Sequence, residues 1–218
     1  MRANYAAAGI PIVVAMGMIV SAGALHAQAN PAHTHIGHVA SGFPAAPDGR
    51  GLLAAAVAEA DVAIQHAGLA LRDPANLEGM KTHAGHVLHA IDPSQASAGP
   101  GLGFGVKQAS EGIAQHMGLA ASAEGASGAV RTHNTHIGAA ARTVAQRADR
   151  VAELARQIQA ATTADQAAPL VQELQTVAQQ LKTGQDADGN GTVGWQEGEG
   201  GLDQATQHVG LLTEAEGL

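Results

Sequence analysis

The sequence predicts an all-α protein built from helical hairpins, and three observations support that fold class. Apolar residues recur every three or four positions, no segment alternates like a strand, and one block of the chain is duplicated. The helical spacing covers residues 51–72, 77–91, 106–123, 129–159, 164–182 and 202–214. Because short turns join the first four segments in two pairs, we expect duplicated hairpins that form a four-helix bundle over residues 51–161.

The duplicated block is marked by the phrase Gln-His-x-Gly-Leu, which occurs at residues 65–69, 115–119 and 207–211. The first two copies are each followed, 17 residues after their histidine, by a His-x-x-His pair that contains His83 or His133. A repeat with histidines at its fixed points indicates a duplicated unit that was built around these imidazoles.

The first 29 residues resemble a secretory signal. Arg2 precedes an apolar run over residues 6–25, and Ala27-Gln28-Ala29 offers a small-x-small cleavage site. The mature chain is therefore expected to be periplasmic or secreted. We expect no later stretch to be long and apolar enough for stable membrane insertion.

Residues 30–50 are expected to form an extended segment, because prolines and glycines interrupt any helical spacing. The segment carries His33, His35 and His38. Short tracts rich in histidine often bind metal, so this arm either joins a site or remains a tail without a fixed role.

Composition excludes several classes of protein. The chain has no cysteine, which rules out disulfides, thiolate metal sites and covalent haem attachment. With 19 acidic and 11 basic residues, it offers no basic surface for nucleic acid. Neither the Glu-x-x-His motif of di-iron bundles nor the His-Glu-x-x-His motif of zinc proteases occurs, so we expect no enzyme.

The turns of the predicted hairpins determine which histidines should meet. The first two helices turn at Asp73-Pro74-Ala75-Asn76, and the next two turn at Glu124-Gly125. Residues equidistant from a turn lie at the same height in an antiparallel pair. His66 should therefore face His83, and His116 should face His133, with all four together if the hairpins pack symmetrically.

Imidazole binds zinc, copper, nickel and haem iron. His86 and His136 lie about one helical turn beyond their partners and can join the same site. Glu59 lies two turns before His66 and is a candidate ligand or hydrogen-bonding partner. The predicted metal ligands are therefore His66, His83, His86, His116, His133 and His136, with His35, His38, His89, His208 and Glu59 as further candidates.

The final 57 residues, 162–218, are predicted to form a helix-loop-helix around the acidic stretch 186–197. That stretch resembles the EF-hand calcium loop, with Gly191 at the sharp turn. The resemblance implies calcium ligands at Asp186, Asp188, Asn190, Thr192 and Glu197. No second loop of this kind is visible, so a single weak calcium site is expected.

The sequence therefore predicts an exported, calcium-binding, histidine-rich protein that binds, stores or delivers a transition metal such as zinc, copper or nickel. One alternative is a b-type haem protein with histidine axial ligands and an electron-transfer role. Another is a structural module, stabilised by calcium, whose histidines face an unknown protein partner. The glycine two places after each repeated histidine fits either close helix packing or clearance for a haem plane.

Overall fold

The computed structural model describes Met1, residues 30–96 and residues 98–218, and the regular structure in that part of the chain is helical throughout. The predicted fold class is confirmed. The signal predicted at residues 1–29 lies outside the described residues except for Met1. The helices are α1 (Pro31–Ala40), α2 (Leu52–Ala70), α3 (Leu77–Ile91), α4 (Val106–Ser122), α5 (Gly128–Ala160), α6 (Ala164–Thr183) and α7 (Leu202–Glu216).

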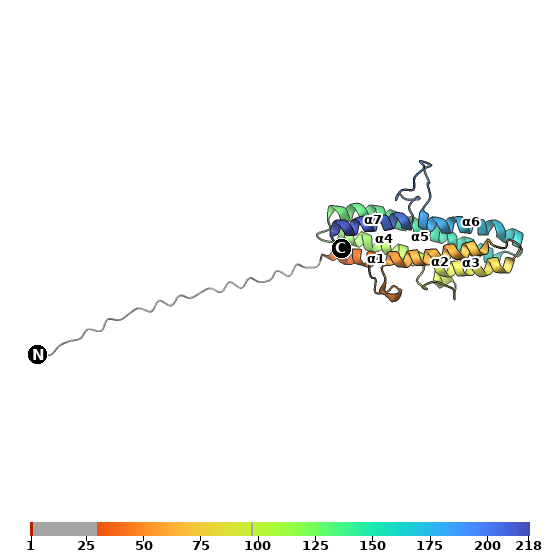
Figure 1. The fold of residues 1–218 in the computed structure, drawn as a ribbon, viewed down its shortest axis with the longest axis horizontal. Helices are drawn as coiled ribbons and strands as arrows, with labels where there is room; N and C mark the ends of the chain where they lie inside the picture. Colours follow the sequence, from red (N-terminus) through yellow and green to blue (C-terminus); the bar gives the residue numbers. More distant parts are fainter. Residues whose placement is uncertain (2–29, 97) are drawn as a thin grey trace.

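The helices form one elongated bundle that the chain traverses four times (Figure 1). The passes are α1 continued by α2, α3 continued by α4, the unbroken α5, and α6 continued by α7. Where a pass is broken, the connecting loop projects from the side of the bundle (Figure 1). Because successive passes run in opposite directions, every seam between consecutive passes joins antiparallel helices.

The bundle has two halves that share α5. In one half, α1 packs on α4 and α7, and both α4 and α7 pack on α5. In the other half, α2 packs on α3 and α6, and these two pack on α5. One helix of 33 residues therefore supports both halves.

Local sequence signals explain why these helices begin where they do. The Asn76 side chain accepts a hydrogen bond from the backbone N–H of Gly79 and caps α3. Ser127 caps α5 and Thr163 caps α6 in the same way. Such caps satisfy donors that a helix leaves unpaired in its first turn, so the predicted boundaries lie within one or two residues of the observed ones.

The prediction of an extended segment over residues 30–50 was wrong for its first part, which forms α1. Asn30 caps this helix, and Pro31 occupies its first turn, where a missing N–H is tolerated. Ala32, Ile36 and Val39 are buried along one face. A stripe of three apolar residues is too short to stand out from neighbouring prolines, and α1 gains its stability by packing on α4.

A continuous core of small aliphatic side chains joins all seven helices. Its members come from both sides of the boundaries predicted at residues 51 and 162. Contrary to expectation, α2 has the length and apolar composition of a membrane-spanning helix. In the bundle it packs against α3, α4 and α6, and most of its buried residues are alanines.

Candidate metal centres

Nine histidines of the described chain gather into three triads, each containing ligand atoms that lie within 4.8 Å of one another. Every triad takes two members from a His-x-x-His pair on one helix and one from a Gln-His-x-Gly-Leu phrase on its antiparallel neighbour. Site 1 joins α1 to α4, site 2 joins α2 to α3, and site 3 joins α5 to α7. The members are His35, His38 and His116 in site 1, His66, His83 and His86 in site 2, and His133, His136 and His208 in site 3.

Helix geometry explains why each triad forms. Residues three apart in a helix point from nearly the same face, so both histidines of a pair face the same neighbouring helix. The third histidine comes from the facing helix. All nine side chains are half-buried, so they lie along the seams between helices and remain reachable from solvent.

The nitrogen atoms of each triad converge. The third histidine places its Nδ1 close to the Nδ1 of both members of the pair: the separations are 3.0 and 3.4 Å in site 1, 3.0 and 3.2 Å in site 2, and 3.2 and 3.4 Å in site 3. Two nitrogens bound to one tetrahedral zinc ion, with bonds of about 2.05 Å, lie about 3.3 Å apart. The same geometry therefore recurs three times at a spacing that suits a shared ion.

The protonation state of these imidazoles also suits a metal. Burial lowers the pKa of His66, His116 and His208, the histidine that each phrase contributes, and the neighbouring imidazoles lower it further. Burial likewise lowers the pKa of His83 and His136. A neutral imidazole keeps the lone pair that a metal ion needs, so these groups are ready to act as ligands near pH 7.

The pairing predicted from the hairpins holds for one triad only. His66 meets His83 and His86, as expected. His116 does not meet His133: it faces α1, where it meets His35 and His38, while His133 and His136 face His208 on α7. The expectation that four copied histidines converge in one site was wrong, because the two hairpins direct their histidines to different neighbours.

A signal for the observed grouping was present in the sequence. The pattern Thr-His-x-x-His followed by Val or Ile occurs at residues 34–39, 82–87 and 132–137. Along the chain, each of these three patterns is followed by one of the three Gln-His-x-Gly-Leu phrases. Their equal number indicates three sites of one kind. It therefore predicts that His35, His38 and His208 are metal ligands like the other six histidines.

Two further candidates have other contacts. Glu59 is fully buried, and its Oε1 accepts hydrogen bonds from the backbone N–H groups of Phe104 and Gly105, at 2.8 and 3.0 Å. It therefore anchors the start of α4. The Nδ1 of His89 lies 3.1 Å from the carbonyl oxygen of Ala96. Among the described residues, neither side chain belongs to a triad.

The acidic loop between α6 and α7 folds around Asp186. This carboxylate accepts backbone N–H groups from Gly189, Asn190 and Gly191, and the hydrogen bond from Gly191 contributes most to lowering its pKa. The side-chain amide of Asn190 donates a hydrogen bond to the Asp188 carboxylate, and its Oδ1 accepts one from the backbone N–H of Thr192.

The last carboxylate of this loop differs from the EF-hand resemblance. Glu197, the residue that the resemblance implies, is exposed. Glu199 is buried, and it groups with Asp186 and Asp188 as a set of carboxylates that could hold one ion. The Oε2 of Glu199 accepts a hydrogen bond from the backbone N–H of Gly194 at 2.9 Å. The backbone carbonyl of Glu199 accepts one from the N–H of Gln185 at 2.9 Å, which brings the end of the loop back to the end of α6.

Comparison with protein-family models, with curated proteins and with solved structures finds no match for this chain. The geometry of the sites is therefore the basis for assigning a function.

Proposed function

We propose that this protein binds transition metal ions at sites 1, 2 and 3 and that it serves to hold, store or deliver them. The observation that carries the proposal is the threefold recurrence of one arrangement, in which one imidazole nitrogen lies 3.0–3.4 Å from those of two histidines across an antiparallel seam. Imidazole nitrogen favours zinc, copper and nickel over the hard cations magnesium and calcium.

The triad geometry favours an ion over haem. A haem with two histidine ligands needs an open slot between the rings for the porphyrin plane. In sites 1 and 2 one pair of rings meets edge to face, with centroids 4.6 Å apart for His66 and His86 and 4.7 Å apart for His38 and His116. In site 3 the rings of His136 and His208 are tilted, with centroids 4.4 Å apart. Rings at that separation fit around a single ion and leave no space for a macrocycle between them.

Metal content at saturation tests the proposal. Purified protein is dialysed against Zn²⁺, and bound zinc is measured by elemental analysis. We expect three ions per chain. The variant H66A/H116A/H208A removes one ligand from every triad, so it should bind none at the same free zinc concentration.

The chain offers a matched control. His33 bonds to Glu216 and His89 lies against a backbone carbonyl, so H33A/H89A removes two histidines without touching a triad. This variant should still bind three ions. Equal zinc uptake by the triple variant and the wild type would contradict the proposal.

We also propose that the loop at residues 186–199 binds one calcium ion. The resemblance to the EF-hand loop and the grouping of Asp186, Asp188 and Glu199 support this site. Trp195 lies in the same loop and can sensitise Tb³⁺ luminescence. We expect a signal that calcium displaces with an apparent dissociation constant on the order of 0.1–1 mM, and D186A should abolish it.

The choice of the last calcium ligand is tested with two charge-neutral variants. If Glu199 is the ligand, E199Q should weaken Tb³⁺ binding much more than E197Q. If E197Q weakens Tb³⁺ binding more than E199Q, Glu197 is the ligand, at the spacing of the EF-hand loop.

We also propose that the protein is exported, because residues 1–29 resemble a secretory signal. An extracytoplasmic location is consistent with a lone weak calcium site, since calcium is abundant outside cells. N-terminal sequencing of the secreted or periplasmic protein tests it: a start at Asn30 supports cleavage after Ala29, and a start at Met1 contradicts it.

A further inference from the structure

Two of the three sites are covered by an aromatic side chain. Phe43, from the loop between α1 and α2, lies edge-on to His38 and His116 of site 1, with ring centroids 5.4 and 5.2 Å apart. Trp195, from the loop between α6 and α7, stacks on His136 of site 3 at 4.0 Å and 26°. Both aromatics come from loops that interrupt a pass of the bundle.

The cover of site 3 is fixed in place by buried groups. The Arg147 guanidinium donates hydrogen bonds to the backbone carbonyls of Gly198, Glu199 and Gly200. The Thr143 hydroxyl accepts the backbone N–H of Gly198 at 3.0 Å. These contacts hold the loop against α5, the helix that carries His136.

Site 2 differs from the other two. Its rings contact one another, and among the described residues no Phe or Trp ring packs on them. His83 instead lines a surface hollow of about 220 Å³ at the turn between α2 and α3. Exposed Arg72 and Asp73 also line this hollow, and buried Met80 contributes to its wall.

A bound metal ion would make the hollow favour an anion, because the exposed Arg72 and Asp73 beside it carry opposite charges. Arg72 and His83 line the same hollow, so the guanidinium lies beside the imidazoles of site 2. The Asp73 carboxylate is engaged with the backbone N–H of Ala75 at 3.2 Å. A metal ion held by His66, His83 and His86 would add further positive charge beside Arg72, so an anionic donor would be attracted to the hollow.

Three histidines leave one position of a tetrahedral ion for another ligand. We infer that the three sites are unequal: site 2 exchanges its metal through a small carboxylate bound in the hollow beside Arg72, while Phe43 and Trp195 retain the metal in sites 1 and 3. This inference rests on the proposed function and adds the class of exchanging ligand and the place where it binds. Exchange would begin with a ligand substitution in which a metal–oxygen bond forms as a metal–water bond breaks. It would be completed as the three metal–nitrogen bonds break and water takes the positions that the imidazoles leave on the ion.

Single-site variants test the inequality. H116A/H208A keeps site 2, H66A/H208A keeps site 1, and H66A/H116A keeps site 3. Each full-length variant is loaded with Co²⁺, whose visible bands report coordination, and is titrated with azide as the anionic probe. Acetate is then added as a competitor to test whether a carboxylate takes the same position.

We expect azide to bind Co²⁺ at site 2 at least about tenfold more tightly than at sites 1 and 3, because a covering shell controls ligand access to a metal. Acetate should displace it. R72Q in the site 2 variant should weaken azide binding, whereas F43A in the site 1 variant and W195A in the site 3 variant should strengthen it.

Equal azide affinity in the three single-site variants would contradict the inference, as would an unchanged affinity after R72Q, F43A and W195A. Failure of acetate to compete would contradict the carboxylate as the exchanging ligand. Absence of Co²⁺ bands in all three variants is a different result, because it would contradict the proposed function itself.

Discussion

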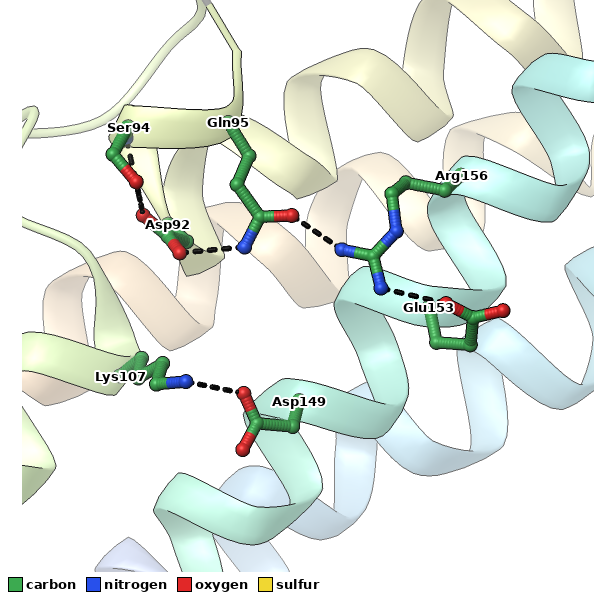
Figure 2. Close-up of polar contacts among 7 residues, drawn as sticks. All are labelled: Asp92, Ser94, Gln95, Lys107, Asp149, Glu153 and Arg156. Carbon is green, nitrogen blue, oxygen red and sulfur yellow. Dashed lines mark hydrogen bonds and ion pairs between the residues drawn. The ribbon is translucent and has the colours of Figure 1, made fainter.

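The two halves of α5 show two ways to close a helix seam. Near its N-terminus, α5 presents His133 and His136 to His208 on α7. Farther along, Arg150 donates a hydrogen bond from Nε to Glu173 on α6 at 3.0 Å. Figure 2 shows that this charged part of α5 also holds the α3–α4 region, through Lys107 with Asp149 and Arg156 with Gln95.

The difference shows that the bundle does not need histidines to pack. Opposite charges attract across the α5–α6 seam. In a triad, burial lowers the pKa of His208, and the neighbouring imidazoles of His136 and His133 lower it further. Three clustered imidazoles therefore add little stability and reduce it in acid. Their threefold recurrence is better explained by an ion that all three nitrogens can share.

The largest expected effect is on stability in the presence of metal. If each triad binds one Zn²⁺, free zinc at about 100 times the dissociation constant should add about 2.7 kcal/mol per site, or about 8 kcal/mol in total. The melting temperature should rise strongly with zinc in the wild type. In H66A/H116A/H208A, zinc should not raise the melting temperature, because each triad has lost a ligand. A similar rise in both proteins would mean that the histidine seams do not bind the zinc that stabilises the protein.

Acid should lower the free energy of unfolding of the metal-free protein, because the triad histidines become protonated. Because five triad histidines have lowered pKa values when folded, the unfolded chain binds more protons below about pH 6.5. Above about pH 6.5 these imidazoles are neutral in both states and cost the folded protein no stability. The folded protein loses stability as the pH falls toward the lowered values. Urea unfolding at pH 7.5 and at pH 5 should show this loss.

The matched comparison for acid is the triple variant. It lacks His66, His116 and His208, so its stability should depend less on pH over the same interval. An equal dependence in both proteins would mean that the triads do not carry the acid sensitivity.

A smaller effect is expected where an aromatic covers a site. W195A should speed the release of metal from site 3 by about tenfold, the lower end of what residues around a metal site contribute. F43A should do the same at site 1. Chelator-driven release, followed in the single-site variants, measures this, and site 2 in the H116A/H208A background should release metal at an unchanged rate when W195A is added.

The smallest effect should come from the seam without histidines. Arg150 and Glu173 are both about half exposed, at 46% and 45% of their side-chain areas. R150A should therefore lower stability by only about 0.2–1 kcal/mol. Zinc content should stay at three ions, and a loss of bound metal in R150A would show that the two kinds of seam are coupled.

Much of this fold follows from local sequence signals. Apolar spacing and turn residues such as Pro74 and Gly125 place six helices, and symmetry about the first turn places His66 beside His83. Local symmetry fails elsewhere because the other triads join distant segments: His35 and His116 are 81 residues apart, and His133 and His208 are 75 apart. Which neighbour a helix face meets depends on the packing of the whole bundle.

The acidic loop shows the same limit at a smaller scale. Its residue types are recognisable from Asp186 to Gly191. The choice between Glu197 and Glu199 depends on how Arg147 and Thr143 hold the returning backbone, and that contact spans more than 50 residues of sequence.

The most direct test of the account is a long-range ¹⁵N–¹H spectrum of the histidine rings during zinc titration. The structure predicts that the Nδ1 signals of the nine triad histidines shift together and stop changing at three equivalents of zinc, while those of His33 and His89 stay in place. Shifts confined to fewer triads, shifts at Nε2 instead of Nδ1, or an equal response from His33 and His89 would contradict it.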